Sequence, residues 1–471
     1  MPAAPVGGRP YNGARAFGAF DNEPKREGIP MRLMRLRLSM AALAASAALA
    51  APLAARAQSL QELYQAAHAY DATYLAAKAL ADSAQYRAEQ VEALGRPSAA
   101  LTSSATRSQL DLPVIGSGGA NALSATLSGK YPLFNRGNAA SIDQARRSLL
   151  SAQADLDSAE QDLIVRVSQA YFDVLAAQDT LGTTRTSKAA ITEQLASAKR
   201  NFEVGTATIT DTREAQARYD LATAVELQAD NDLRAKRIAL DTLVGRSNIA
   251  PNPLVVPVVL PPPLPDDANV WVNNAEGAHP AIRRAKVALD VAQLEIDKAR
   301  AGQLPTVDAV GSAGAARNTG FGVSLPGNSK SASIGVQLNW PLYTGGSVQN
   351  RIKETLVLED KARSDLEASR RAVSQGTRVA FFGVQSGLAQ VKALEAAEAS
   401  SKLALEATQL GYRVGVRVNL DVLNAQTQLF TTQRDLAKAR YDVLVGSLKL
   451  RQAAGQLSPG DVEALNALLA R

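Results

Sequence analysis

Apolar and polar residues alternate one by one in two segments of the chain, at residues 123–133 and 333–342. The apolar positions are Leu123, Ala125, Leu127, Tyr131 and Leu133 in the first segment, and Ile334, Val336, Leu338, Trp340 and Leu342 in the second. This period of two predicts β-strands with one apolar and one polar face. A weaker strand pattern precedes each segment, at about 97–109 and 305–317, and loops rich in Gly and Ser join the pairs at 116–120 and 320–331. We therefore predict four strands in the chain.

Most of the remaining sequence has a hydrophobic period of seven. One series contains Ile142, Leu149, Leu156 and Leu163, and a second contains Val422, Leu429, Leu436, Val443, Leu450 and Leu457. Small residues lie between these positions, so the pattern predicts long supercoiled helices that approach one another closely. Between residues 137 and 203 there is no proline and a single internal glycine, Gly182. A helix over this segment reaches about 100 Å at 1.5 Å per residue, and its counterpart is predicted over 346–413.

The two halves of the chain repeat one another. Residues 131–137 (Tyr-Pro-Leu-Phe-Asn-Arg-Gly) match residues 340–346 (Trp-Pro-Leu-Tyr-Thr-Gly-Gly), and residues 202–205 (Phe-Glu-Val-Gly) match residues 412–415 (Tyr-Arg-Val-Gly). The match indicates two copies of one architecture: helix, strand, strand, long helix, helix. Prolines crowd the segment between the copies, which excludes a helix or a central strand there. The predicted organisation is a first repeat at 58–250, a linker at 251–266, a second repeat at 267–457 and a C-terminal tail at 458–471.

Residues 1–57 are predicted to be a leader with a signal peptide. Three arginines at 32, 35 and 37 precede an apolar stretch at 38–53, and alanines at 55 and 57 occupy the positions that a signal peptidase reads. We expect cleavage after Ala57 and a mature chain from Gln58. A membrane-spanning helix is the alternative, but the apolar stretch is short for the roughly 20 residues that a span needs. Residues 1–30 have no role in front of a signal peptide, so Met31 or Met34 is a candidate for the true start.

Composition and charge narrow the choice of function. The chain has 471 residues, of which 46% are apolar and only 5% aromatic, a balance that suits closely packed helices. The net charge of +6 invites a nucleic-acid interpretation. However, residues 1–57 contribute eight basic and three acidic side chains, which leaves 43 basic and 42 acidic ones elsewhere, so no nucleic-acid surface is predicted. The chain has no cysteine, which excludes disulfides and a lipid anchor on an N-terminal Cys.

The strands and helices need one common explanation. Strands with one apolar and one polar face suit a barrel in a membrane, whose outer face meets lipid and whose inner face meets water. Four strands cannot close such a barrel, because even the smallest need about eight. Strand edges cannot stay unpaired in lipid. The chain is therefore expected to pool its strands with copies of itself, while its long helices project out of the membrane as a second barrel.

The repeated Tyr/Trp-Pro-Leu segments and the helix turn at 412–423 (Tyr-x-Val-Gly, then Asp-Val-Leu) resemble those of the TolC family of outer-membrane factors. The resemblance covers residues 59 to 457. It implies a mostly α fold with a small β part: the protomer of a homotrimer with a twelve-stranded outer-membrane β-barrel, continued by a twelve-helix coiled-coil barrel in the periplasm. It also implies a passive exit channel in outer-membrane lipid of a Gram-negative bacterium. The partners would be a periplasmic adaptor protein and an inner-membrane ABC exporter or proton-driven pump.

The same resemblance implies a gate at the periplasmic tip of the helices, near the turn glycines Gly205 and Gly415. Carried over to this sequence, the gate residues are Thr210 and Asp211 on one turn and Tyr412 and Arg417 on the other. The alternative is that Asp211 is an ordinary helix-capping residue and Arg417 a solvated charge.

The resemblance also implies rings of carboxylates at the constriction of the channel. Asp421 occupies one ring position, and Asn424 occupies a second position where an aspartate is expected. This departure would halve the charge of the ring and weaken its preference for cations.

No catalytic or cofactor motif is found in the sequence, so no enzyme and no cofactor are predicted. His68 and His279 have no metal partners at ligand spacing, and we expect surface or core histidines. Tyr131 and Trp340 are candidates for aromatics at the membrane interface, with core packing as the alternative. The function predicted is export in type I protein secretion, small-molecule efflux or both. Alternatives are a dedicated drug-efflux factor or, in other classes, a trimeric coiled-coil adhesin or a periplasmic adaptor. Neighbouring genes would separate secretion from efflux: an ABC exporter with an adaptor favours secretion, and a proton-driven pump favours efflux.

Overall fold

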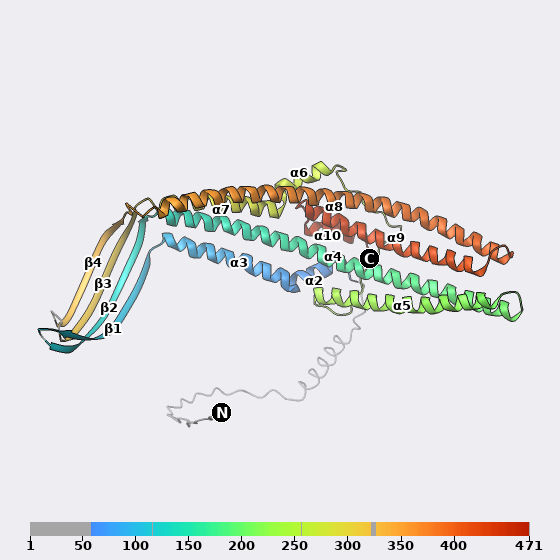
Figure 1. The fold of residues 1–471 in the computed structure, drawn as a ribbon, viewed down its shortest axis with the longest axis horizontal. Coiled ribbons are helices and arrows are strands. Elements are labelled where there is room, and N and C mark those ends of the chain that lie inside the picture. The colour runs from blue at the N-terminus through green and yellow to red at the C-terminus, as the bar shows by residue number, and fades with distance from the viewer. Residues whose placement is uncertain (1–57, 115, 256, 322–325, 471) are drawn as a thin grey trace, which may run out of the picture. The chain divides into compact units, whose positions relative to one another are not determined.

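The computed structural model describes residues 58–114, 116–255, 257–321 and 326–470 (Figure 1). The predicted leader, its cleavage position and the candidate start residues lie outside the described residues. The elements of the first repeat are α2 (Leu60–Tyr70), α3 (Ala72–Glu92), the short 3-10 helix η1 (Ala93–Gly95), β1 (Ser98–Leu112), β2 (Gly116–Phe134), α4 (Arg136–Glu203) and α5 (Ile209–Val244). Those of the second are α6 (Ala268–Ala278), α7 (Pro280–Ala301), β3 (Thr306–Gly320), β4 (Gly327–Asn339), α8 (Ser347–Arg413) and α9 (Asn419–Ala453), followed by α10 (Pro459–Asn466).

Both halves have the predicted order of helix, strand, strand, long helix and helix. The long helices α4 and α8 have 68 and 67 residues, as the absence of proline in these segments predicts. Each begins beside the sheet and ends at a tight turn at the far end, and α5 and α9 return along the far part of α4 and α8 (Figure 1). None of the helices in the described residues combines the length and hydropathy that a membrane-crossing helix requires.

The seven-residue period of the last long segment is confirmed by burial. All six positions of the series from Val422 to Leu457 are at most 7% exposed, although Leu457 lies beyond the end of α9. In α4, Leu163 is fully buried, whereas Ile142, Leu149 and Leu156 are half-buried. Ile142 and Leu149 lie in the part of α4 nearer the sheet, where α3 and α7 pack against it, whereas Leu156 packs against the edge of the main core.

The strands form one antiparallel sheet in the order β1-β2-β3-β4. The register places Leu127 opposite Leu101 on one side and Ala313 on the other. One residue along, Thr126 lies opposite Thr102 and Gly314. Apolar residues thus share one face of the sheet and polar residues share the other, as the alternation predicts.

The two faces of the sheet differ in exposure. Leu127 is 53% exposed and Val336 is 67% exposed, and both belong to the apolar face. On β2 and β3, polar-face residues such as Ser124 and Thr126 are half-buried. Hydroxyl pairs also join neighbouring strands on that face, with 2.8 Å between the Oγ atoms of Ser104 and Ser124. Side chains crowd together on the polar side and spread apart on the apolar side, so the sheet curves with its apolar face outward.

The predicted loops at 116–120 and 320–331 are too long, and this part of the prediction is wrong. β2 begins at Gly116, directly across from Leu112, and β3 continues to Gly320. The small residues here pair because their partners are in place, not because of a strong strand preference of their own. Gly118 illustrates the reason: a Cβ at this position would lie 2.3 Å from the Cβ of Phe321, so only glycine allows the aromatic ring to cross the strand.

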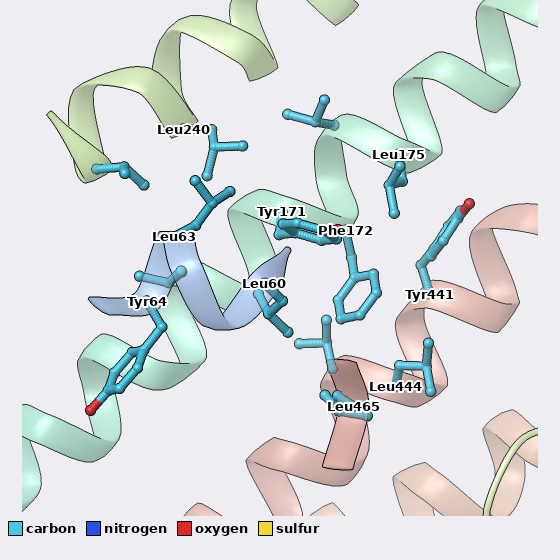
Figure 2. Close-up of a cluster of buried hydrophobic side chains, with 14 of the residues drawn as sticks. Leu60, Leu63, Tyr64, Tyr171, Phe172, Leu175, Leu240, Tyr441, Leu444 and Leu465 are labelled. Atoms are coloured by element: carbon cyan, nitrogen blue, oxygen red, sulfur yellow. The ribbon is translucent and has the colours of Figure 1, made fainter. Parts of the chain in front are cut away.

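The main core lies in the middle of the helical part, where α2, α4, α5, α9 and α10 meet (Figure 2). Phe172 of α4 stacks on Tyr441 of α9 with 5.8 Å between ring centroids. Tyr171 donates its hydroxyl to the carbonyl of Asn252 at 3.0 Å, which fixes the Pro-rich linker against α4. The linker thereby closes over the core instead of separating two independent bodies.

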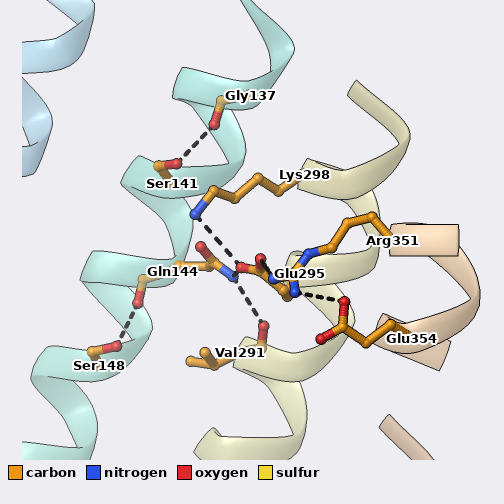
Figure 3. A network of polar contacts seen from close by, with 9 residues as sticks. All are labelled: Gly137, Ser141, Gln144, Ser148, Val291, Glu295, Lys298, Arg351 and Glu354. Atoms are coloured by element: carbon orange, nitrogen blue, oxygen red, sulfur yellow. Dashed lines mark hydrogen bonds and ion pairs between the residues drawn. The ribbon is translucent and has the colours of Figure 1, made fainter. Parts of the chain in front are cut away.

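Near the sheet, a polar network joins α4, α7 and α8 (Figure 3). Gln144 donates to Glu295 at 2.7 Å, and Arg351 donates to the other oxygen of the same carboxylate at 2.7 Å. Burial by itself raises the pKa of Glu295, but these two hydrogen bonds and the positive charges of Lys298 and Arg351 together hold the pKa below its usual value. The network fixes the three helices at the point where they leave the sheet.

Candidate gate at the helix tip

Two tight turns, each between a long helix and its partner, form the tip opposite the sheet (Figure 1). Gly205 and Gly415 have φ of 79° and 81°, a left-handed conformation that favours glycine. The amide of Thr206 donates to the carbonyl of Asn201 at 2.8 Å, and the amide of Val416 donates to that of Gly411 at 2.9 Å. The sequence repeat is thus reproduced, hydrogen bond by hydrogen bond, in both turns.

The helices that follow the two turns are capped differently. In α5, Thr208 and Asp211 form a capping box: the Asp211 carboxylate accepts from the Thr208 amide at 2.9 Å and from its hydroxyl at 2.7 Å. In α9 the N-cap residue is Val418, which has no side-chain acceptor or donor. Asp421 is the repeat counterpart of Asp211, but its carboxylate has no capping partner and is free to bind another group.

The group that pairs with the Asp421 carboxylate is the guanidinium of Arg417. One guanidinium nitrogen of Arg417 lies 3.6 Å from a carboxylate oxygen of Asp421, one turn along α9. The two side chains are 62% and 37% exposed, so the pair contributes at most about 1 kcal/mol to stability. Such a pair can open or exchange partners at little cost, which is what a gate requires.

Tyr412 contacts the other hairpin. The side-chain amide of Asn201, on α4, donates to the Tyr412 hydroxyl at 3.3 Å. Asn201 and Tyr412 stand at the last turns of α4 and α8, so this hydrogen bond joins the two long helices next to their turns.

Asn424 also contacts the other hairpin. Arg218, on α5, donates to the Asn424 side-chain oxygen at 2.9 Å. A carboxylate at position 424 would attract the same guanidinium more strongly, because hydrogen bonds between charged groups are roughly twice as strong as neutral ones. With asparagine, Arg218 keeps a neutral partner, and the tip carries one negative charge fewer than it would with aspartate at this position.

Below these polar contacts the two hairpins share a small apolar cluster. Its buried residues are Ile191, Leu195 and Ala198 of α4, Ala215 of α5 and Leu423 of α9. Beside it, Gln194 donates to Asn419, which is only 3% exposed. The tip therefore has a packed base and a polar, exposed end, so the end can move without loss of the base.

Within one chain, the predicted gate residues of the first turn do not contact those of the second among the described residues. Arg417 pairs with Asp421, while the Thr210 and Asp211 side chains bind Thr208 within their own turn. Within the described residues of one chain, no hydrogen bond or ion pair links either of these two to Tyr412 or Arg417. The sequence prediction also missed Asn201 and Arg218. The sequence repeat contained a signal for Asn201. Its counterpart in the second turn is Gly411, so the first turn has a polar side chain at a position where the second has none.

Both histidines make local contacts within the helical part. The His68 ring packs against Tyr74 with 4.4 Å between centroids, and His279 caps α7 by accepting from the amide of Ala281 at 3.1 Å. Burial lowers the pKa of His279, which keeps the imidazole neutral and able to accept. In the part of the chain that the structure describes, no group of three or more acidic, histidine or cysteine side chains could hold a metal ion.

Known proteins resemble this chain in both sequence and fold. The sequence model of the outer membrane efflux protein family matches residues 63–246 and 271–456. The chain is similar to the outer membrane protein TolC of Vibrio cholerae, with 32% identity over 87% of this chain and 94% of the relative. It is also similar to the alkaline protease secretion protein AprF of Pseudomonas aeruginosa, with 32% identity over 72% of this chain and 70% of the relative.

Among solved structures, the fold resembles the outer membrane protein VceC of Vibrio cholerae, with a TM-score of 0.71, 20% identity, and coverage of 84% of this chain and 96% of VceC. This likeness concerns the fold alone. Because the family model matches both halves of the sequence and a relative is similar over nearly its whole length, the chain belongs to the outer membrane efflux protein family, and the predicted resemblance to TolC-type outer-membrane factors is confirmed.

Proposed function

We propose that this protein is an outer-membrane exit channel in which three copies close one barrel of twelve strands, and their long helices continue it as a tunnel in the periplasm. The observation that carries the proposal is that the sheet has two open edges. Its outer strands β1 and β4, of 15 and 13 residues, each have one side without a strand partner in the described residues. Four strands are too few to close a barrel, and open edges are not tolerated in lipid. Pairing β4 of one copy with β1 of the next satisfies both edges.

The chemistry of the two sheet faces fits this arrangement. The outward-curving face holds Leu101, Leu127, Ile334 and Val336, all more than half exposed in the single chain. Contact with lipid costs these apolar side chains little free energy, whereas their exposure to water is unfavourable. The inner face holds serine and threonine hydroxyls that suit a water-filled lumen.

The helices carry matching apolar edges. On α8, large side chains remain exposed, among them Val357 at 68%, Val379 at 66% and Phe382 at 56%. On the opposite edge, Leu80 of α3 and Leu227 of α5 are exposed to 70% and 69%. In the closed ring these edges would meet, so assembly buries apolar surface along the tunnel as well as in the barrel.

The tip is the proposed gate. Thr210, Asp211, Tyr412 and Arg417 would hold the hairpins of neighbouring copies together when the channel is closed, and Asp421 would form a ring of three carboxylates around its axis. Asn424 would leave the second ring uncharged. The weak local contacts of Arg417 support this role, because a solvent-exposed pair can exchange its partner.

Export rather than catalysis is the proposed activity. The channel would receive cargo from an inner-membrane ABC exporter or proton-driven pump through a periplasmic adaptor. The similarity to a protease secretion protein favours type I secretion as one use, and the family of efflux proteins favours small-molecule efflux as another. Membership of this family supports a channel over an adhesin or an adaptor.

The experiment is to express the full chain in a Gram-negative host and separate the membranes. We expect the mature protein in the outer-membrane fraction, a trimeric mass by native mass spectrometry, and single-channel currents in planar bilayers. A bilayer-inserted monomer, or a protein found only in the soluble periplasmic fraction, would contradict the proposal.

A further inference from the structure

Three cations stand on the apolar face of the sheet, at the end that lies farthest from the helices. They are Arg107 of β1, Arg317 of β3 and Lys330 of β4, and all three are exposed. The register shows that they share the face of Leu127: Arg107 lies opposite Asn121, Arg317 opposite Leu123 and Lys330 opposite Ala315. We call these three residues the outer basic cluster. The polar face, which carries Ser124 and Thr126, does not contain them.

The cluster extends across the sheet from β1 to β4, and its neighbouring members lie within reach of one another. Arg107 and Arg317 flank β2 on either side and line one hollow of about 250 Å³ together with Asn121 and Leu123. Lys330 is the diagonal neighbour of Arg317, because it follows by two residues the position opposite Arg317. Diagonal neighbours on one face lie about 7–8 Å apart, within reach of long side chains that converge on one anion.

The cluster has no acidic partner of its own. Among the ion pairs and side-chain hydrogen bonds of the described residues, none involves Arg107, Arg317 or Lys330. The one described carboxylate on this face and end of the sheet is Asp111, four residues beyond Arg107 on β1. Three guanidinium or ammonium groups therefore face one carboxylate, and the local charge is positive.

The position along the strands explains what the cations are for. Ile334 and Val336 continue the same face from Lys330 toward the helices, and Trp340 stands at its other end. Lys330 and Trp340 are thus separated by ten residues, which matches the 9–11 or so residues of a strand that crosses a bilayer. A cation at this height cannot lie against acyl chains without cost, but it suits the layer of lipid headgroups.

We infer that the outer basic cluster binds the phosphate groups of anionic lipids, whose acyl chains lie on the adjoining apolar rows of the same face. The inference rests on the proposed function, in which this face of the sheet meets the membrane. Arginine pairs with phosphate in a bidentate geometry, and Arg107 and Arg317, on either side of β2, can hold one headgroup between them. With three copies, the channel carries three such sites around its outer rim, in the leaflet nearer the strand turns.

The test uses the full-length trimer in a neutral detergent, with phosphatidylglycerol as the anionic lipid and phosphatidylcholine as the neutral one. Bound lipids are counted by native mass spectrometry as the concentration rises. The main variant combines Arg107→Gln, Arg317→Gln and Lys330→Gln. The control combines Arg87→Gln, Arg237→Gln and Lys402→Gln, which removes the same charge from exposed positions on α3, α5 and α8.

We expect the native protein to bind phosphatidylglycerol in preference to phosphatidylcholine. The main variant should lose this preference, with affinity for phosphatidylglycerol lower by about a hundredfold, because each cation near an anionic lipid contributes roughly fivefold. The control should bind as the native protein does. A second variant, Asn121→Asp, places a carboxylate opposite Arg107 and should weaken binding without removing any cation, which guards against poor folding of the triple variant.

Two results would overturn the inference. One is a main variant that keeps the native preference as a trimer; the other is complete displacement of the lipid by inorganic phosphate at constant ionic strength, which would indicate an anion site without a role for lipid. Failure of the proposed function is recognised separately, since the native protein would then bind neither lipid and would not sit in the outer membrane.

Discussion

The carboxylate of Asp421 lies 3.6 Å from the guanidinium of Arg417. Asp211, 210 residues earlier and at the same place in the repeat, is instead held by Thr208 in a capping box. The difference follows from one residue, because Val418 stands where the first repeat has Thr208. One hairpin therefore has a fixed helix start at the tip, and the other has a carboxylate available to its neighbours.

Replacing Val418 by threonine should give α9 the cap that α5 has. The new hydroxyl would compete with Arg417 for Asp421 and stabilise the start of the helix by about 1 kcal/mol. Hydrogen exchange of amides in residues 414–422, followed by mass spectrometry, should slow down several-fold. The matched control is Val416→Thr, which places a hydroxyl two residues too early to cap. Equal protection in both variants would show that the missing cap does not loosen the second hairpin.

Replacing Tyr412 by phenylalanine together with Arg417 by serine should open the tip. The first change removes the hydroxyl that accepts from Asn201, and the second removes the cation beside Asp421. Each lost contact costs about 1 kcal/mol, and six are lost per trimer, so the closed population should fall. Conductance in planar bilayers should rise, and cells should take up large antibiotics. Arg413→Ser, one turn earlier on α8, is the control and should leave conductance unchanged; a closed double variant would contradict the gate assignment.

Charge at the constriction should set ion preference. Asp421→Asn would remove three negative charges from around the axis of the proposed channel, and the preference for cations should fall most at low salt, where screening is weakest. Asn424→Asp should do the reverse, although Arg218, which donates to position 424 at 2.9 Å, will neutralise part of the added charge. Reversal potentials in asymmetric KCl measure both effects. Unchanged reversal potentials in both variants would mean that neither residue faces the ion path.

The helices and their turns could be predicted from the sequence because their causes are local. Heptad spacing specifies α4 and α9, the absence of proline specifies the lengths of α4 and α8, and the left-handed turns require Gly205 and Gly415. The strand ends could not be predicted, because glycine and serine residues near Gly118 pair only once Phe321 crosses them. The contacts of the gate residues could not be predicted for a similar reason. Asn201 and Tyr412 are 211 positions apart, and their contact depends on how two hairpins pack, which no local pattern encodes.

Stability should depend on pH through Asp71. This carboxylate is bound by both terminal nitrogens of Arg166 at 2.8 and 2.9 Å and caps α3 by accepting from the Tyr74 amide. The hydrogen bonds from Arg166 are the main cause that lowers the pKa of Asp71 below its ordinary value of 3.8. A lowered pKa in the folded state means that the stabilisation is complete above that value and is lost as the pH falls below it.

The substitution Asp71→Asn keeps a good capping residue but removes the charge. At pH 7 it should lower trimer stability by about 1–2 kcal/mol per chain, at the lower end for a charged hydrogen bond because Arg166 is partly exposed. Melting temperatures of the native and variant trimers should converge as the pH falls below 3.8. A difference that is constant from pH 7 to pH 3 would show that packing, not ionisation, makes Asp71 important.

The two faces of the sheet offer the most direct test of the membrane assignment. Leu127→Arg places a charge on the outward apolar face, between Leu101 and Ala313, and should cost about 2–4 kcal/mol if that face meets the middle of the bilayer. Thr126→Arg changes the next residue, on the inner face, where the charge points into water and only narrows the lumen.

The same pair of changes can be repeated on an edge strand, with Val336→Arg on the outer face and Gln337→Arg on the inner face. We expect the outer-face variants to assemble poorly and to lose heat-resistant trimer, while the inner-face variants assemble normally and alter only conductance and ion preference. The contrast between the two faces should persist in every detergent that keeps the trimer intact, because the detergent forms an apolar belt around the sheet. Equal losses on both faces would mean that protein, not lipid, covers the outward side, and the strands would then belong to a domain buried away from the membrane.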